Sequence, residues 1–266
     1  MYKNMPLLYK YKLFFLKLIV TLLLTIIFSC SGNKKKEIVY EERSLSVIYN
    51  SALVKLKSKN YDDAILEFDE VERQHPYSVW ARKSILMSSY SSYKNRDFIK
   101  AEVNLKRYIG LYPASNLVPY AQYLLAMCYY DQIIDNKRDQ TAVSNAYQTF
   151  KLILDRYPDT AYAKDSYYKL IFLEDIMAAK EMNIAKTYFS LKKYIAAAKR
   201  FKNIVNNYQT TSFVPEALHR LVEVYLILGV TEEALLNARV LGHNFPDSKW
   251  YKYSYKLLEE KKLLNK

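Results

Sequence analysis

A short pattern of residues that recurs five times along the chain constrains its fold more than any other feature. Each copy has an alanine, a second apolar residue four positions later and, in four of the five copies, a proline eight positions after that. The copies are Ala64-Phe68-Pro76, Ala101-Leu105-Pro113, Ala146-Phe150-Pro158, Ala197-Phe201-Gln209 and Ala234-Ala238-Pro246. Alanine fits where two helices cross closely, the second residue fills the space beside the crossing, and proline ends a helix. The recurrence therefore predicts five helices of one kind.

A second set of small or compact residues predicts the partners of these helices. The set lies twelve residues before four of the alanines and consists of Ala52, Ser89, Ala185 and Val222. Ala126 is the corresponding residue of repeat three, and the intervals from Ala52 to Ser89, from Ser89 to Ala126 and from Ala185 to Val222 are each 37 residues long. Helix pairs at such an interval are typical of tetratricopeptide repeats, whose minimal period is about 34 residues. We expect an all-α, superhelical solenoid of five tetratricopeptide helix pairs with a C-terminal capping helix, since four glycines and seven prolines leave little material for the turns of an all-β protein.

Two irregularities predict where the repeat departs from its period. In repeat three the paired positions are 20 residues apart instead of 12, so we expect eight extra residues in the turn around residues 135–139. Ala185 follows Pro158 by 27 positions, whereas Ser89 follows Pro76 by 13, so this interval holds fourteen extra residues. No proline or glycine interrupts residues 160–193, which predicts one long helix. The expected organisation is an N-terminal block of repeats at 44–158 and a C-terminal block at 159–266, with the closing helix within 247–264.

The first 29 residues have the organisation of a secretory signal. Basic residues precede an apolar run of about a dozen residues, which is shorter than the roughly 20 needed to span a bilayer. The run ends at Ile27-Phe28-Ser29-Cys30, which resembles a bacterial lipobox, although Phe28 is larger than the residue usual at its position. We expect a signal peptide at 1–29, lipidation of Cys30 and a flexible tether at 30–43. An uncleaved signal anchor is the alternative.

Residues around Cys30 also indicate the destination and the charge of the exported chain. Ser31 lacks the aspartate that retains lipoproteins in the inner membrane of enteric bacteria, and by resemblance to that sorting rule the chain is expected at the periplasmic face of the outer membrane. Cleavage removes four lysines and no acids, so the formal net charge falls from +13 to +9. This surplus fits an acidic partner or a membrane surface. Nucleic acid is not expected, because acids interleave with the bases and the chain is exported.

Several stretches of the sequence carry a family resemblance. They are Arg138-Asp139-Gln140-Thr141, Tyr157-Pro158-Asp159-Thr160, Lys193-Tyr194, Arg200-Phe201 and Asn244-Phe245-Pro246-Asp247-Ser248 with Trp250. Together with the five repeats, the lipobox and the long helix, they make the chain resemble the BamD family, also called ComL, over nearly all of residues 30–260. The resemblance departs at Gln209, where the family usually has proline. It implies membership of the complex (BAM) that folds and inserts β-barrel proteins into the outer membrane, with other lipoprotein subunits and unfolded outer-membrane proteins as partners.

The same resemblance implies a partner-binding residue. In that family the C-terminal repeats hold the last periplasmic POTRA domain of the barrel-forming subunit, and an arginine in the second helix of repeat four takes part. The matching residue here is Arg200. A solvated helix charge is the alternative interpretation, because Lys199 and Lys202 lie beside it.

A peptide groove is predicted from the first helices of repeats one to three. The positions that line the concave wall of such a stack are rich in tyrosine, with a few lysines, and include Tyr49, Lys57, Lys83, Tyr90, Tyr93, Lys94, Tyr120, Tyr123 and Tyr130. Tyrosine offers rigid apolar area with a hydroxyl group, and lysine offers a counter-charge, so this wall suits an extended apolar peptide with a terminal carboxylate. The alternative is that the tyrosines pack one repeat on the next.

The sequence contains no pattern of residues typical of an enzyme. The three histidines lie far apart, no glycine-rich phosphate loop is present, and Cys128 lies at an inward helical position that is typical of a small buried hydrophobe. We expect no enzymatic activity, no metal and no cofactor beyond the covalent lipid. The rival function is that of another periplasmic tetratricopeptide adaptor, serving cell division or envelope maintenance.

Overall fold

A computed structural model describes residues 42–135 and 140–264 of the chain. These residues form eleven α-helices and no strand, and all the helices belong to one compact unit, residues 43–266. The helices are α2 (Leu45–Lys57), α3 (Tyr61–Gln74), α4 (Val79–Lys94), α5 (Phe98–Leu111), α6 (Val118–Asp135), α7 (Gln140–Arg156), α8 (Ala161–Ser190), α9 (Tyr194–Asn207), α10 (Val214–Ile227), α11 (Thr231–Asn244) and α12 (Lys249–Glu260).

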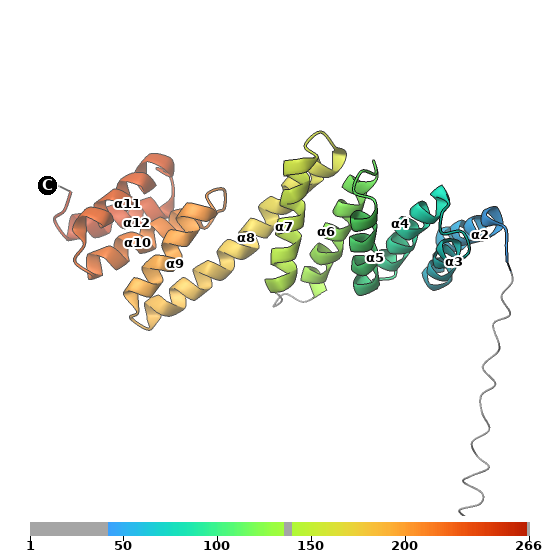
Figure 1. The fold of residues 1–266 in the computed structure, drawn as a ribbon. Helices are drawn as coiled ribbons and strands as arrows, with labels where there is room; N and C mark the ends of the chain where they lie inside the picture. Colours follow the sequence, from blue (N-terminus) through green and yellow to red (C-terminus); the bar gives the residue numbers. More distant parts are fainter. Residues whose placement is uncertain (1–41, 136–139, 265–266) are drawn as a thin grey trace, which may run out of the picture. The chain divides into compact units, whose positions relative to one another are not determined.

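Each helix packs mainly on its neighbours in the sequence, so that α2 to α11 form five antiparallel pairs in series (Figure 1). The pairs begin with α2 and α3 and end with α10 and α11, and α12 packs on both helices of the last pair. Ser248 caps the start of α12 by accepting a hydrogen bond from the backbone N–H of Tyr251. The predicted all-α fold, its five helix pairs and its closing helix are confirmed.

The repeated small residues lie where the two helices of each pair cross. The crossing residues of the first helices, namely Ala52, Ser89, Ala126, Ala185 and Val222, are all fully buried, and so are the repeat-pattern alanines of the second helices. Four of the five larger residues beside them, Phe68, Leu105, Phe150 and Phe201, are also 0 % exposed. Close approach of two backbones thus explains why the pattern requires small side chains at fixed positions.

The turn after the second helix has nearly the same backbone conformation in repeat two, where a proline follows, and in repeat four, where none does. Tyr112, which precedes Pro113, has φ −129° and ψ 54°. Tyr208, which precedes Gln209, has φ −131° and ψ 48°. The missing proline therefore leaves the turn unchanged, since the packing of α9 on α10 also holds it in place.

The insertion in repeat three does not lie mainly in the turn, so that prediction is wrong in part. Helix α6 has 18 residues and α7 has 17, and only residues 136–139, which lie outside the described residues, separate them. Most of the extra length therefore extends the two helices. No proline or glycine stops them there, and Ile133 and Ala142 are buried between them, so continued packing favours the longer helices.

The long helix of repeat four is confirmed. Helix α8 has 30 residues, and Thr160 caps its start by accepting a hydrogen bond from the N–H of Ala163. One large core cluster ends at Leu173 in the first half of α8, and another begins at Met182 in its second half. The division into blocks at 44–158 and 159–266 stays a prediction.

Candidate partner-binding surfaces

Arg200 lies on α9 and is held by an acid of α8. Its Nη1 donates to both carboxylate oxygens of Glu181, at 3.0 and 3.1 Å. The Glu181 side chain is 15 % exposed and the Arg200 side chain 41 % exposed, so the ion pair fixes the guanidinium while leaving much of it open to solvent. A second group can therefore approach Arg200 without the first contact being lost.

The surroundings of Arg200 carry an excess of positive charge. The arginine lines a cavity of about 620 Å³ together with Tyr188, Ala196, Lys199, Lys202, Asn203, Asn206 and Asn207. Lys199 and Lys202 are exposed, and neither has an ion pair among the described residues. Such a cavity favours a carboxylate from a partner over a cation. Arg200 and its two lysine neighbours were predictable from the sequence, whereas Glu181 was not, because its contact depends on how α8 packs against α9.

The tyrosines of the predicted groove are all half-buried and pack between consecutive repeats. The hydroxyl group of Tyr93 on α4 donates to Asp131 on α6 at 2.5 Å, and that of Tyr123 on α6 donates to Asp165 on α8 at 2.6 Å. Burial, together with these carboxylates, raises the pKa of both phenols. The hydroxyl groups of these two residues are thus already hydrogen-bonded within the chain, which leaves partly exposed ring surface for contact with another molecule.

The other tyrosines of this set make ring contacts. Tyr49 packs edge-on against Phe68 and Trp80, with ring centroids 5.6 and 4.7 Å apart. The remaining three, Tyr90, Tyr120 and Tyr130, pack against the core cluster of repeats two and three. The ring of Tyr120 lies 5.8 Å from that of Tyr162, and the ring of Tyr130 lies 6.0 Å from that of Phe150. These tyrosines therefore pack one part of the stack against the next. Their role in peptide binding stays a prediction.

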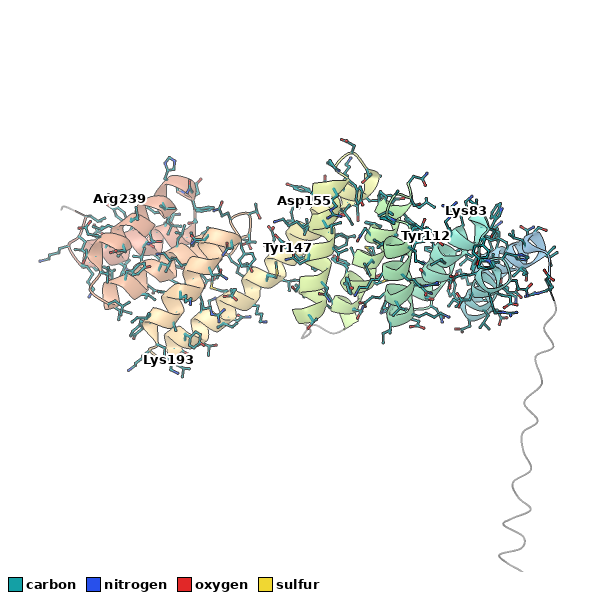
Figure 2. The ribbon with its side chains drawn as sticks, in the orientation of Figure 1. Lys83, Tyr112, Tyr147, Asp155, Lys193 and Arg239 are labelled. Atoms are coloured by element: carbon teal, nitrogen blue, oxygen red, sulfur yellow. The ribbon has the colours of Figure 1, made fainter. Side chains whose placement is uncertain are left out.

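The three lysines of the predicted groove lie on the surface. Lys57, Lys83 and Lys94 are exposed. Lys83 is labelled on α4 in Figure 2. Its ammonium group lies 4.6 Å from the centre of the Trp80 ring. Lysine side chains of this kind can provide counter-charge to a carboxylate.

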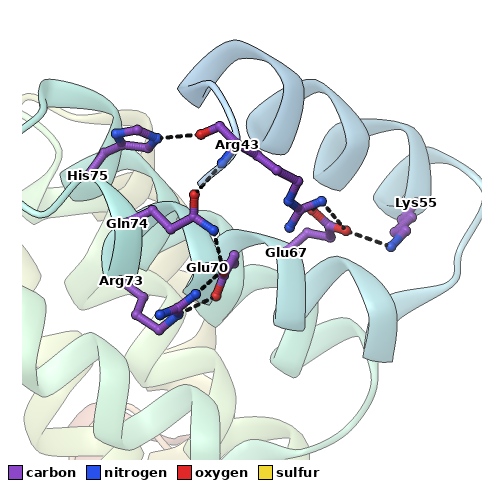
Figure 3. A network of polar contacts seen from close by, with 7 residues as sticks. All are labelled: Arg43, Lys55, Glu67, Glu70, Arg73, Gln74 and His75. Atoms are coloured by element: carbon purple, nitrogen blue, oxygen red, sulfur yellow. Dashed lines mark hydrogen bonds and ion pairs between the residues drawn. The ribbon is translucent and has the colours of Figure 1, made fainter. Parts of the chain in front are cut away.

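A network of polar contacts fixes the start of the helical unit at Arg43 (Figure 3). The backbone N–H of Arg43 donates to Gln74 at 2.8 Å, and its carbonyl oxygen lies 2.9 Å from Nε2 of His75. Its guanidinium pairs with Glu67 at 3.2 Å, and Glu67 also pairs with Lys55 at 3.1 Å. Arg43 is therefore tied to α3 through its backbone and its side chain. Cys30, the signal peptide and residues 30–41 of the tether lie outside the described residues.

The described part of the chain offers neither a metal-binding group nor a reactive thiol. Within residues 42–135 and 140–264, no group of three or more His, Cys, Asp or Glu side chains could hold a metal ion. Cys128 is fully buried on α6, and burial raises the pKa of its thiol to about 12. A thiol of this kind is a poor nucleophile at neutral pH. No helix among the described residues is long and apolar enough to cross a membrane.

The helix pairs, their buried crossing residues and these surfaces define a scaffold of tetratricopeptide-type repeats. Residues 41–241 match the family model YfiO, described as outer membrane lipoprotein. The chain is 44 % identical over 232 residues to the "Outer membrane protein assembly factor BamD" of Caulobacter vibrioides, covering 87 % of this chain and 76 % of the relative. It is 38 % identical over 215 residues to the protein of the same name from Rickettsia prowazekii, covering 81 % of this chain and 86 % of the relative. The chain belongs to this BamD (YfiO) family of outer membrane lipoproteins.

Among solved structures, a thermophilic TPR protein of Thermus thermophilus aligns with this chain at a TM-score of 0.36 and 17 % sequence identity. That alignment covers 80 % of this chain and 97 % of the other.

Proposed function

We propose that this chain is a lipid-anchored scaffold of the machinery that assembles β-barrel proteins in the outer membrane. Relatives that cover most of the chain are named for outer membrane protein assembly, and this is the observation that carries the proposal. The role is one of binding and positioning, not of catalysis, since repeat scaffolds present extended surfaces to partners. Cys30 bears the lipid that holds the chain at the periplasmic face of the outer membrane.

Arg200 contacts the barrel-forming subunit in this proposal. The partner group is a carboxylate of a POTRA domain, which enters the basic cavity beside Lys199 and Lys202. Support comes from the half-exposed guanidinium, which Glu181 orients without covering, and from the charge of the cavity. A charge-assisted hydrogen bond at such a site contributes about 1.5–3 kcal/mol to binding.

The tyrosine-rich wall of repeats one to three receives unfolded outer-membrane proteins in this proposal. Their extended apolar segments contact the partly exposed rings of residues such as Tyr90 and Tyr120, and exposed lysines such as Lys83 meet a terminal carboxylate. Other lipoprotein subunits bind elsewhere on the scaffold.

A pull-down from outer membranes tests the proposal. The full lipidated chain is recovered in mild detergent, and the proteins that accompany it are identified by mass spectrometry. We expect an integral barrel protein with periplasmic POTRA domains, which is lost with Arg200→Glu. Glu181→Ala removes the same ion pair but keeps the arginine, so the partner should be recovered in a smaller amount and not lost. Arg239→Glu, the same charge change on the exposed face of α11 (Figure 2), is a second control that should retain it.

Recovery of cell-division or envelope-maintenance proteins without a barrel protein would contradict the proposal and support the rival adaptor function. Loss of the barrel protein with Glu181→Ala as strongly as with Arg200→Glu would show that the ion pair acts through folding of repeat four. A circular dichroism melt of each variant separates that case from loss of the contact.

A further inference from the structure

Four neighbouring apolar side chains in the first half of α8 are exposed to solvent. Tyr167 is 53 % exposed, Tyr168 61 %, Ile171 37 % and Phe172 47 %. They follow one another within two turns of the same helix, so they form one continuous surface. We call these four residues the open face of α8. Contiguous apolar surface of this kind marks a binding site more often than scattered exposed residues do.

The length of α8 explains why this face is uncovered. Ala178, Met182 and Ala185 in its second half are 0 %, 1 % and 0 % exposed, because α9 packs there. Ile171 precedes Ala178 by seven residues and therefore lies on the same side of the helix. Helix α9 has 14 residues against the 30 of α8, so it covers about half of the longer helix (Figure 1).

A hydrogen bond made by the chain after α9 shows where α9 stops packing on α8. The hydroxyl group of Thr210, three residues after the end of α9, donates to Glu174 of α8 at 2.9 Å. The chain has therefore left α9 by the level of Glu174, and no second helix of the pair continues toward Ile171.

The spacing of the repeat indicates that a helix fits the open face of α8. Ile171 follows Pro158 by 13 residues, which is the interval that separates Pro76 from Ser89 and Pro113 from Ala126. Ser89 and Ala126 are crossing residues and are 0 % exposed, because a second helix lies against each of them. Ile171 is thus at the position where the other repeats accept a helix, and here that helix is missing from the pair.

Two charged residues on the same side of α8 have no ion partner among the described residues. They are Lys164 and Asp175, which are 11 residues apart, or about 16 Å at the helical rise of 1.5 Å per residue. Oδ1 of Asp175 lacks a hydrogen-bond partner among the described residues. The other three acids of α8 each have a partner, namely Tyr123 for Asp165, Thr210 for Glu174 and Arg200 for Glu181. The Asp175 side chain is partly exposed and its carboxylate has no ion partner among the described residues, so a cation of another molecule can approach it.

We propose that the open face of α8 binds an amphipathic helix of another protein, which takes the place of the absent second helix. Its apolar residues, spaced at three and four positions, pack on Tyr167, Tyr168, Ile171 and Phe172. A basic residue of the partner pairs with Asp175, and an acidic residue pairs with Lys164. The charges at both ends of the apolar surface give the bound helix one direction. This inference does not depend on the Arg200 contact or on the assembly role.

Site-specific photocrosslinking tests the inference. A benzophenone amino acid replaces Ile171 in the full lipidated chain, which is produced in its own host and irradiated in intact cells. A second chain carries the same amino acid at Val103, which is 60 % exposed on α5 and serves as a matched control. We expect position 171, and not position 103, to cross-link another protein through a helical segment that carries an acid and a base about 11 residues apart.

Charge reversal makes the test decisive. Asp175→Lys should lower the cross-link yield at position 171 at least about tenfold, because it sets two like charges against each other in the bound helix pair, and a Lys→Asp or Arg→Asp change in the partner helix should restore the yield. Cross-linking to a second copy of this chain, to lipid, or to no molecule would overturn the inference. So would a cross-link that is unchanged by Asp175→Lys in a chain whose circular dichroism melt is that of the wild type.

Discussion

At the scale of single residues, His219 couples the last helix pair to the closing helix. The ring is 5 % exposed on α10, and its Nδ1 shares a hydrogen bond of 2.8 Å with the hydroxyl group of Ser254 on α12. Burial lowers the pKa of His219 below its ordinary value of 6.5, and the charge of Arg220 lowers it as well. The nearby acids Glu223 and Glu216 raise the pKa but do not cancel the shift. The folded chain therefore disfavours the charged ring more than the unfolded chain does.

The pH dependence of stability follows from this difference. Because the unfolded state binds the proton of His219 at a higher pH, the free energy of unfolding is greatest above pH 6.5 and falls as the pH drops through 6.5 toward the lowered pKa. Urea unfolding at pH 7.5 and 5.5 measures the fall. His219→Gln should reduce it, while His243→Gln, a change at an exposed position, should not. An equal fall in wild type and His219→Gln would contradict this account.

The two cysteines should differ fully in their reactivity toward a thiol reagent. Cys128 is buried and its pKa is raised to about 12, so it should not react in the folded chain. The proposed lipid blocks the thiol of Cys30. Titration of the mature protein with a disulfide reagent should therefore detect no thiol in buffer and a single thiol in guanidinium chloride. Detection of both thiols after denaturation would contradict lipidation of Cys30.

At the scale of helices, the turns inside the pairs store backbone strain at corresponding positions. Lys59, Arg96, Lys192 and Gly229 follow the first helices of their pairs with φ of 63°, 62°, 59° and 74°. The left-handed conformation costs a residue with a side chain roughly 1–2 kcal/mol, and glycine adopts it freely. Gly229 is therefore the one residue of the four that fits its turn without strain.

A reciprocal pair of substitutions tests this interpretation. Lys192→Gly should raise the free energy of unfolding by about 1 kcal/mol, and Gly229→Ala should lower it by about the same amount. A Cβ at Gly229 would meet no atom within 4 Å, so any loss there reports backbone strain and not a clash. Chemical denaturation of both variants measures the two effects. Destabilisation by Lys192→Gly would show that the lysine side chain matters more than its φ.

How much could be predicted from the sequence depends on whether a feature is periodic. The helix pairs and the length of α8 were predictable, because every crossing needs a small residue at a fixed interval. The partners Arg200–Glu181 and Tyr123–Asp165 were not, because they join residues 19 and 42 positions apart through the packing of α8. The insertion of repeat three was misplaced because continued packing, with Ile133 and Ala142 buried, extends α6 and α7, and spacing alone does not reveal this packing.

At the scale of the whole molecule, long helix α8 brings together two functions of the scaffold in our account. Its second half carries Glu181, which orients Arg200 for the barrel-forming subunit, and its first half carries the open face for a partner helix. The two sites use different residues of one helix. A substitution at either site should therefore leave the other one intact, which distinguishes local contacts from a general loss of folding.

The amount of folded barrel protein in the outer membrane tests directly whether this chain acts in barrel assembly. The chromosomal copy is depleted in cells that express the wild type, Arg200→Glu or Arg239→Glu, and folded and unfolded barrels are separated by their heat-dependent migration in gels. We expect folded barrels to fall on depletion and to recover with the wild type and Arg239→Glu but not with Arg200→Glu. Folded barrels that stay at their normal level throughout depletion would contradict a role in their assembly.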